Sequence, residues 1–331
     1  MTRKYQVVGI GNALVDVLCH AGEDFLAEQG IAKGVMQLID RDRALELYGA
    51  MGPSVEVSGG SAANTIAGIA SLGGRTAYVG KVRDDQLGRI FAHDMRAQGA
   101  DYAEPMAVKD NSHGTGRCMV LVTPDGERSM STYLGISEYL SPGDIDKTLM
   151  ADTDWLYLEG YRFDGADSHA AFARAIGACR AGGGKVALTL SDPFCVQRHR
   201  AALRRMIVED LDLLFCNHAE MLEMYQTGDL DTALGIASGE VETVVCTDSE
   251  NGAHVLAGGE RWLAPAVPTE VVDATGAGDM FAAGFLWGVT HGHEPMTAAA
   301  MGNVAASEVI SHIGARPEAD LMQLYRSHGL V

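Results

Sequence analysis

The stretch Val271-Val272-Asp273-Ala274-Thr275-Gly276-Ala277-Gly278-Asp279 decides the fold, because it joins a strand-like run to a long apolar helical pattern. The segment 270–272 favours a strand because Val271 and Val272 are β-branched, and the helix formers from Met280 onward favour a helix. Gly276 and Gly278 carry no Cβ, so the connecting turn can direct several backbone N–H groups at one point. Because a helix N-terminus leaves donors unpaired and is the positive end of the dipole, this point should bind an anion.

Asp279 is the unexpected residue of this stretch, because a carboxylate beside an anion site repels the anion. The Asp279 carboxylate would instead interact with a group that approaches the phosphate and must lose a proton. The pattern therefore favours phosphoryl transfer to a hydroxyl, with Asp279 as base and the glycine N–H groups neutralising the phosphoryl oxygens. Because a helix N-terminus stabilises the carboxylate, we expect a weak base that mainly orients the acceptor. Taken alone, the motif could also be a tight turn between helix-entry carboxylates.

Composition narrows the class of protein. A chain of 331 residues with 47% hydrophobic content can build one large α/β domain or two ordinary ones. The net charge of -19 argues against a nucleic-acid or anionic-membrane partner. No apolar run or leader pattern suggests a membrane span or export, so we expect a cytoplasmic protein. The six cysteines form no Cys-x-x-Cys pair and predict neither a zinc site nor a disulfide frame.

Residues 5–11 read as a buried first strand. Gly9 and Gly11 suggest a dinucleotide fingerprint, but Leu14 occupies the third glycine position and a strand pattern continues where a helix should start. A nicotinamide-dependent oxidoreductase is therefore disfavoured. Asn12 and Asp16 follow the strand at the edge where open α/β sheets bind ligands, although both could simply form turns.

Two segments leave the α/β pattern, at about 14–40 and 107–135. The second contains a hairpin that turns at Asp125-Gly126, and the two segments could pair into a small β-sheet lid. Between them, Gly59-Gly60 opens a helix, with Asn64 one turn inside it. This junction can offer N–H groups and an amide to sugar hydroxyls, or be a plain loop-to-helix connection.

After the second segment, strands and helices alternate. Strands are expected at 155–158, 185–190, 211–216 and 243–246, and helices at 168–181, 198–209 and 219–225. This rhythm predicts a mostly parallel sheet with helices on both faces, and no linker divides residues 1–331 into separate domains. Asn217 and Glu220 begin one helix with i, i+3 spacing, so the pair could hold hydrated Mg²⁺ or simply be a helix start.

These motifs together resemble those of the ribokinase-like kinases, the PfkB carbohydrate kinase family, over about residues 5–316. Asp-Ala-Thr-Gly-Ala-Gly-Asp at 273–279 resembles the family's C-terminal motif, the Gly-Gly segment at 59–60 its N-terminal motif, and Asn217 to Glu220 its Asn-x-x-Glu motif. Residues 245–252 resemble its nucleotide loop, except that Ser249 replaces a glycine.

The resemblance implies a ribokinase-like fold with a small β lid, ATP with Mg²⁺ as phosphoryl donor, and a hydroxymethyl group as acceptor. It implies roles for the following residues: Asp279, Gly276 and Gly278 in catalysis; Asn12, Asp16, Gly60 and Asn64 in substrate binding; Asn217, Thr247, Gly252, Gly276, Gly278 and Asn303 in nucleotide binding; Glu220 and Asn217 in holding Mg²⁺ through water. Asp273 would help to hold a monovalent cation such as K⁺.

The acceptor is predicted from finer resemblances. Gly-Asn-Ala-Leu-Val-Asp at 11–16 resembles the opening of adenosine kinases, and the 59–64 segment lacks the lysine typical of ribokinases. Adenosine is therefore favoured, with a free sugar (fructose, ribose or 2-keto-3-deoxygluconate) as the alternative. A non-catalytic sugar or nucleotide sensor is a further alternative, although such a sensor should lack Asp279. We expect a monomer, or a homodimer through an exposed edge of the lid.

Overall fold

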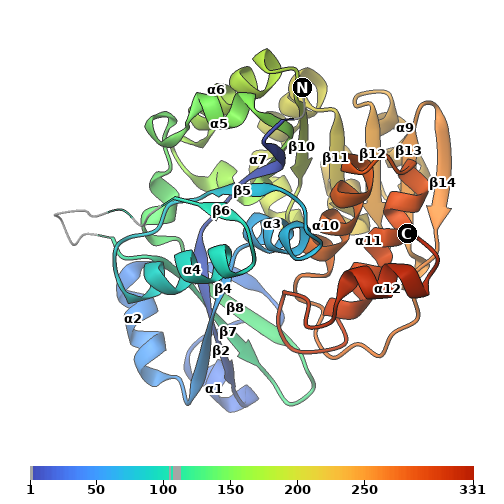
Figure 1. Ribbon diagram of the computed structural model, residues 1–331. Helices are drawn as coiled ribbons and strands as arrows, with labels where there is room; N and C mark the ends of the chain where they lie inside the picture. Colours follow the sequence, from blue (N-terminus) through green and yellow to red (C-terminus); the bar gives the residue numbers. More distant parts are fainter. Residues whose placement is uncertain (1–2, 104–105, 107–112) are drawn as a thin grey trace.

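The computed structural model describes residues 3–103, 106 and 113–331, and two sheets of different size dominate its fold (Figure 1). The large sheet contains β1 (Tyr5–Ile10), β5 (Thr76–Val79), β6 (Asp101–Tyr102), β9 (Thr153–Glu159), β10 (Lys185–Thr189), β11 (Leu213–Asn217), β12 (Thr243–Thr247), β13 (Ala253–Ala257) and β14 (Glu260–Ala264). Their order is β14-β13-β12-β11-β10-β9-β1-β5-β6. Neighbours from β12 to β6 pair in parallel, whereas β13 and β14 pair antiparallel. The sheet is therefore mostly parallel, as predicted.

Helices cover both faces of the large sheet. One face packs against α3 (Ser61–Ser71), α4 (Gln86–Ala97), α10 (Ala277–Thr290), α11 (Pro295–Val309) and α12 (Leu321–Ser327), and the other against α5 (Lys147–Ala151), α6 (Ser168–Ala181), α7 (Pro193–Asp210), α8 (His218–Tyr225) and α9 (Leu230–Ser238). Successive strand residues alternate between the two cores, because neighbouring side chains of a strand point to opposite faces. Val7 packs in the first core and Val8 in the second.

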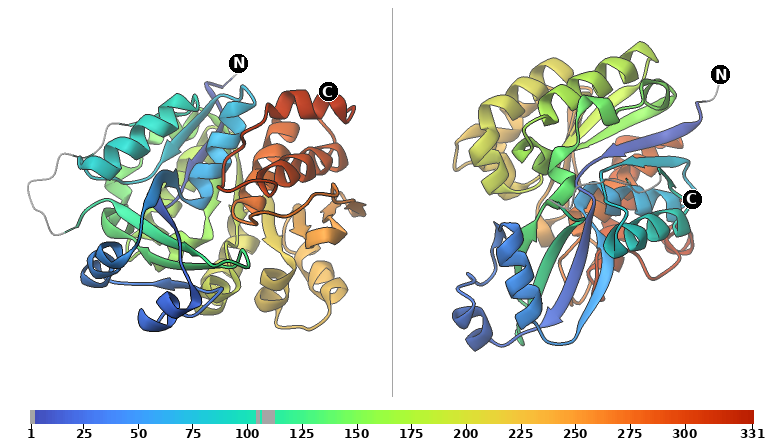
Figure 2. Two further views of the ribbon diagram at one scale, coloured as in Figure 1. Left: turned by 90° about the horizontal axis from the view of Figure 1, so that it is seen from below. Right: turned by 90° about the vertical axis from the view of Figure 1, so that its left-hand side faces the viewer.

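The smaller sheet projects beyond the carboxyl end of β1 (Figure 2). It contains β2 (Leu14–His20), β3 (Met36–Leu38), β4 (Ser54–Gly59), β7 (Gly116–Val122) and β8 (Arg128–Tyr133) in the order β3-β8-β7-β2-β4. One face of this sheet is covered by α1 (Glu23–Glu28) and α2 (Arg41–Ala50). Strand β4 lies outside the two segments expected to form the lid, and residues 107–112 of the second segment lie outside the described residues.

The strand predicted at 270–272 is wrong. This segment is irregular, Val271 is 61% exposed, and the backbone N–H of Val272 donates to the carbonyl of Ile310 at 2.8 Å. The chain thus returns from β14 to the sheet end as a loop tied to α11, and α10 begins at Ala277 rather than at Met280.

Among the residues that the structure describes, no helix combines the length and apolar character that crossing a membrane would require.

Candidate active site

A cleft of about 1150 Å³ lies between the carboxyl edge of the large sheet and the inner face of the smaller sheet. Nearly all residues expected in the site line it: Asn12, Asp16, Gly60, Asn64, Asn217, Glu220, Thr247, Gly252, Gly276, Gly278, Asp279 and Asn303. Asp273 does not line the cleft and is buried behind it. Segments from both ends of the chain therefore meet at one place, where parallel α/β sheets commonly bind ligands.

Asp279 is held by the first turn of α3. The Ser61 hydroxyl donates to Asp279 Oδ1 at 2.6 Å, and the Asn64 amide donates to Oδ2 at 3.0 Å. Burial raises the pKa of the Asp279 carboxyl, while these two hydrogen bonds lower it. We expected the helix end to lower the pKa of Asp279 and so weaken it as a base, but its pKa is raised instead. Removing the carboxylate from water outweighs the stabilising contacts. A carboxyl with a raised pKa is a stronger proton acceptor.

The two glycines beside Asp279 differ in whether the surrounding structure leaves room for a side chain. Gly276 has φ +81°, and a Cβ there would lie 2.7 Å from Ala315 Cα, so the turn requires glycine. A Cβ on Gly278 would meet no atom within 4 Å. Gly278 therefore keeps open the space in front of the first turn of α10, where unpaired N–H groups and the positive helix end favour an anion.

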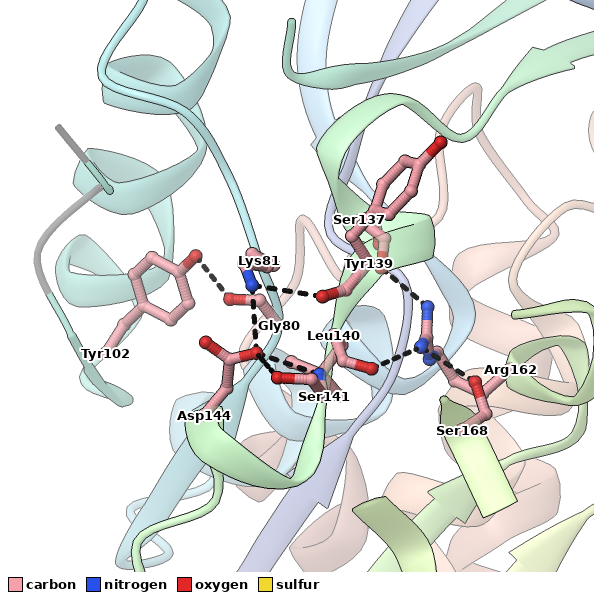
Figure 3. A network of polar contacts seen from close by, with 10 residues as sticks. All are labelled: Gly80, Lys81, Tyr102, Ser137, Tyr139, Leu140, Ser141, Asp144, Arg162 and Ser168. Atoms are coloured by element: carbon pink, nitrogen blue, oxygen red, sulfur yellow. Dashed lines mark hydrogen bonds and ion pairs between the residues drawn. The ribbon is translucent and has the colours of Figure 1, made fainter. Parts of the chain in front are cut away.

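The Asn12 side chain is oriented by a buried arginine. Arg162, 1% exposed, donates from Nη1 to Asn12 Oδ1 at 2.9 Å. Its remaining bonds, to the carbonyls of Ser137 and Leu140 and to the Ser168 hydroxyl, fix the guanidinium (Figure 3). Because Asn12 Oδ1 is occupied, the amide offers its NH₂ group to the cleft as a donor.

Asp16 faces the cleft from the inner face of β2. Burial raises its pKa to about 7, with Asp279 raising it further and the charges of Arg316 and Arg128 opposing the shift. A Cβ on Gly59 would lie 2.1 Å from Asp16 Oδ2, and one on Gly60, at φ +98°, would lie 2.2 Å from the Asn12 carbonyl oxygen. The Gly59-Gly60 pair therefore makes room for the Asp16 side chain and for the Asn12 backbone.

Glu159 was not predicted. It ends β9, is 1% exposed, and accepts hydrogen bonds from the backbone N–H groups of Asn12 at 3.2 Å and Ala62 at 2.9 Å. Burial raises its pKa to about 7. Its position at the carboxyl end of a predicted parallel strand could have identified it as a site residue, because ligands bind at this end of such strands.

Arg128, also not predicted, connects the smaller sheet to the glycine loop. Its guanidinium forms an ion pair with Asp273 and donates to the Thr275 hydroxyl at 2.9 Å. Asp273 also accepts backbone N–H bonds from Thr275 at 2.9 Å and Gly314 at 2.8 Å. Its charge is therefore balanced within the chain.

Asn217 and Glu220 form a reciprocal helix cap. Asn217 Oδ1 accepts from the Glu220 N–H at 2.8 Å, and Glu220 Oε2 accepts from the Asn217 N–H at 3.0 Å. The predicted proximity is present, although these bonds also match the plain helix-start alternative. Burial raises the Glu220 pKa to about 7. Because each carboxylate oxygen has two lone pairs, Glu220 can still accept a bond from a water bound to a cation.

The other end of the cleft is built from β12, β13 and α11. Ser249, where the resembling family has glycine, adopts φ +49°, so the serine takes the left-handed conformation that glycine permits. A Cβ on Gly252, at φ +97°, would lie 2.1 Å from the Ala264 carbonyl. The Asn303 amide donates to the carbonyls of Ala264 and Pro265 at 3.1 and 2.9 Å, which fixes the loop after β14.

A carboxylate of raised pKa, an open helix N-terminus beside it and a deep cleft with polar groups at both ends suit transfer of a phosphoryl group to an alcohol. The class of protein that this fold and site define is an ATP-dependent phosphotransferase.

Comparison with known proteins identifies the family. A model described as pfkB family carbohydrate kinase matches residues 32–321, and the chain belongs to this family. It is similar to the adenosine kinase from Sinorhizobium meliloti, with 46% identity, 98% of this chain and 99% of that chain covered, and a TM-score of 0.92.

A probable sugar kinase from Rhizobium etli CFN 42 is 42% identical with both chains fully covered and a TM-score of 0.94. The 5-dehydro-2-deoxygluconokinase of Shouchella clausii is 28% identical over 262 residues, which cover 76% of this chain and 80% of that protein. The predicted family and ribokinase-like fold are thus confirmed, while the relatives differ in the substrates that their names state.

Proposed function

We propose that the protein phosphorylates the hydroxymethyl group of a nucleoside, with adenosine as the favoured acceptor. The observation that carries this is the apolar part of the cleft on the smaller sheet. Apolar side chains line the cleft there: Leu14, Met36, Leu38, Met130 and Leu134. A planar base has apolar faces that such a wall can bury, whereas a free sugar presents hydroxyl groups that the wall cannot satisfy. The similarity to the Sinorhizobium meliloti adenosine kinase supports the same acceptor.

The sugar end of the acceptor would lie against the polar groups beside this wall. Asn12 offers an amide NH₂ group, and Asp16 offers carboxylate oxygens to ribose hydroxyls. The wall and these groups are connected, because Asp16 pairs with Cys118, Cys118 with Thr132, and Thr132 with Leu38 along one row of the sheet. One acceptor can therefore contact both.

In the reaction, the hydroxymethyl oxygen attacks the terminal phosphorus of ATP, and the bond from that phosphorus to the oxygen shared with ADP breaks. Asp279 takes the proton of the attacking hydroxyl, while Ser61 and Asn64 keep its carboxylate oriented. The N–H groups at the start of α10 neutralise the charge that develops on the phosphoryl oxygens. Mg²⁺, when bound, shields the phosphate charges, and Glu220 and Asn217 would hold it through water.

A role for K⁺ stays a prediction. Arg128 already places a positive charge on Asp273, so the chain itself supplies much of what a monovalent cation there would provide. The oligomeric state also stays a prediction. A homodimer would form through the edge strand β4, where Val55 is 63% and Val57 is 37% exposed, and light scattering would distinguish it from a monomer.

Phosphorylation of a free sugar is the second candidate, favoured by the similarity to 5-dehydro-2-deoxygluconokinase. The deciding experiment is ADP release with MgATP and a panel of adenosine, guanosine, cytidine, ribose, fructose, 2-keto-3-deoxygluconate and 5-dehydro-2-deoxygluconate, with and without K⁺. Turnover with adenosine and not with sugars supports the proposal, and the reverse pattern contradicts it. Binding without turnover would indicate a sensor, and Asp279→Asn serves as the catalytically impaired control.

A further inference from the structure

A second cavity, of about 200 Å³, lies on the reverse face of the smaller sheet. It is lined by Arg41, Ala44 and Leu45 of α2, Arg83 and Asp85 before α4, His113 and Gly114 before β7, and Arg117 and Tyr133 of the smaller sheet. Side chains alternate between faces along a strand, so Arg117 and Tyr133 point away from the active-site cleft while their neighbours Cys118 and Thr132 line it. The two cavities are thus separated by one sheet.

Two arginines that form no ion pair with any described residue distinguish this cavity. Many arginines elsewhere pair with carboxylates, among them Arg3, Arg128, Arg180, Arg198, Arg200, Arg204 and Arg261. The side chains of Arg41 and Arg117 have no ion pair or hydrogen bond with any residue that the structure describes. The Arg117 guanidinium lies 5.7 Å from the centre of the Tyr48 ring, and its buried Nε has no hydrogen-bond partner among the described residues. In a chain with 44 acidic and 25 basic residues, two guanidiniums at one cavity that have no carboxylate partner among the described residues are unexpected.

The acidic residue of the cavity does not neutralise these guanidiniums. Asp85 caps α4 by accepting from the Gly88 N–H at 2.8 Å, and it accepts from the Thr115 hydroxyl at 2.7 Å and the Thr115 N–H at 2.9 Å. The remaining polar groups of the wall are the Tyr133 hydroxyl and the His113 ring, whose Nδ1 lies 3.5 Å from that hydroxyl. These groups can donate hydrogen bonds to a ligand oxygen.

We propose that this cavity binds a small phosphorylated ligand through Arg41 and Arg117. Guanidinium groups match the oxygens of a phosphoryl group in geometry and charge. At about 30 Å³ for each water of the liquid, the cavity has the volume of six or seven waters. A phosphate therefore fits with room for a short organic group. The overall charge of -19 repels anions, so a local cluster of this kind is what an anion would need.

A ligand in this anion site would contact both the smaller sheet and the large α/β unit. Arg117 and Tyr133 belong to the smaller sheet, α2 packs on that sheet, and residues 83–85 belong to the large α/β unit, leading into α4 (Figure 1). A bound phosphoryl group would therefore connect the two sheets from behind and favour one orientation of the smaller sheet over the active-site cleft.

The test is calorimetric titration of the full chain with inorganic phosphate and, separately, with ribose 5-phosphate. Arg41→Gln and Arg117→Gln should each weaken one binding event about tenfold or more, the loss expected for one charge-assisted hydrogen bond. Arg326→Gln is the matched control, because it removes the same charge from an exposed position of α12, on the other side of the molecule (Figure 1). Phosphate that binds at the start of α10 should be unaffected by all three changes.

Loss of the same binding event in both variants, but not in Arg326→Gln, supports the site, and the tighter of the two ligands identifies the source of the phosphoryl group. Arg41 is exposed, so Arg41→Gln should fold even if Arg117→Gln does not. Unchanged titrations of folded Arg41→Gln and Arg117→Gln with both ligands would overturn the assignment. This result would be independent of the identity of the phosphoryl acceptor, because neither arginine lines the active-site cleft.

Discussion

Replacing Ser61 with alanine tests how the protein sets the basicity of Asp279. The Ser61 hydroxyl donates a 2.6 Å hydrogen bond to the carboxylate and lowers its pKa, so its removal should raise that pKa further. A hydrogen bond to a charged group contributes about 1.5–3 kcal/mol, and one pKa unit corresponds to about 1.4 kcal/mol. The pKa of Asp279 should therefore rise by about 1–2 units in Ser61→Ala.

The assay is the pH dependence of kcat/KM, which reports the ionisation of the free enzyme. The acidic limb should move to higher pH by the same amount, with activity recovered above the new pKa. Thr65→Val is the control, because the Thr65 hydroxyl bonds to the backbone carbonyl of Asp279 at 3.1 Å and not to the carboxylate. An acidic limb that does not move, or an equal loss of activity at every pH, would refute this account of the base.

Three further changes test other parts of the site. Gly278→Ala should fold with an unchanged or slightly higher Tm but bind ATP more weakly, because its Cβ meets no protein atom. Gly276→Ala should be strongly destabilised, because its Cβ would clash. Thermal unfolding checks the stability of both variants, and the KM for ATP checks the binding. Burial raises the Glu220 pKa from 4.5 to about 7, so its stabilising contribution is complete below pH 4.5 and lost as the pH rises through 7. In urea unfolding of the ligand-free protein, Glu220→Gln should remove up to about 3 kcal/mol of this decline between pH 5 and 8, and an unchanged decline would contradict it. Arg128→Gln should make turnover more dependent on K⁺ than in the wild type, because it removes the positive charge beside Asp273; equal stimulation by K⁺ in both would contradict this.

The motifs that could be predicted from the sequence are those whose chemistry is local. The turn at Gly276, the helix at 168–181 and the contact between Asn217 and Glu220 depend on neighbours in the chain, and the structure contains all three. The hairpin of β13 and β14 was missed although its signal was readable. Gly258 and Gly259 have φ +60° and +82°, as a two-residue hairpin turn requires.

Contacts between distant segments could not be predicted. Ser61 and Asp279 are 218 positions apart, and nothing near either residue specifies the other. The prediction of a strand at 270–272 was wrong for a related reason. The β-branched residues of this segment favour a strand, but its backbone bonds go to the end of α11 instead of a neighbouring strand. Tertiary contacts therefore outweighed the local preference.

The two cavities share β7 and β8, and this gives a stronger test of the anion site than binding alone. If a phosphoryl ligand behind the sheet favours the sheet orientation that also favours the acceptor, the two ligands must strengthen each other by the same factor. The affinity for adenosine should then rise in saturating phosphate by the factor by which adenosine raises the affinity for phosphate. Arg41→Gln should abolish both effects together, because Arg41 lines the second cavity and does not line the active-site cleft. Affinities that do not change, that fall together, or that rise together to the same extent in Arg41→Gln would contradict coupling through this cavity.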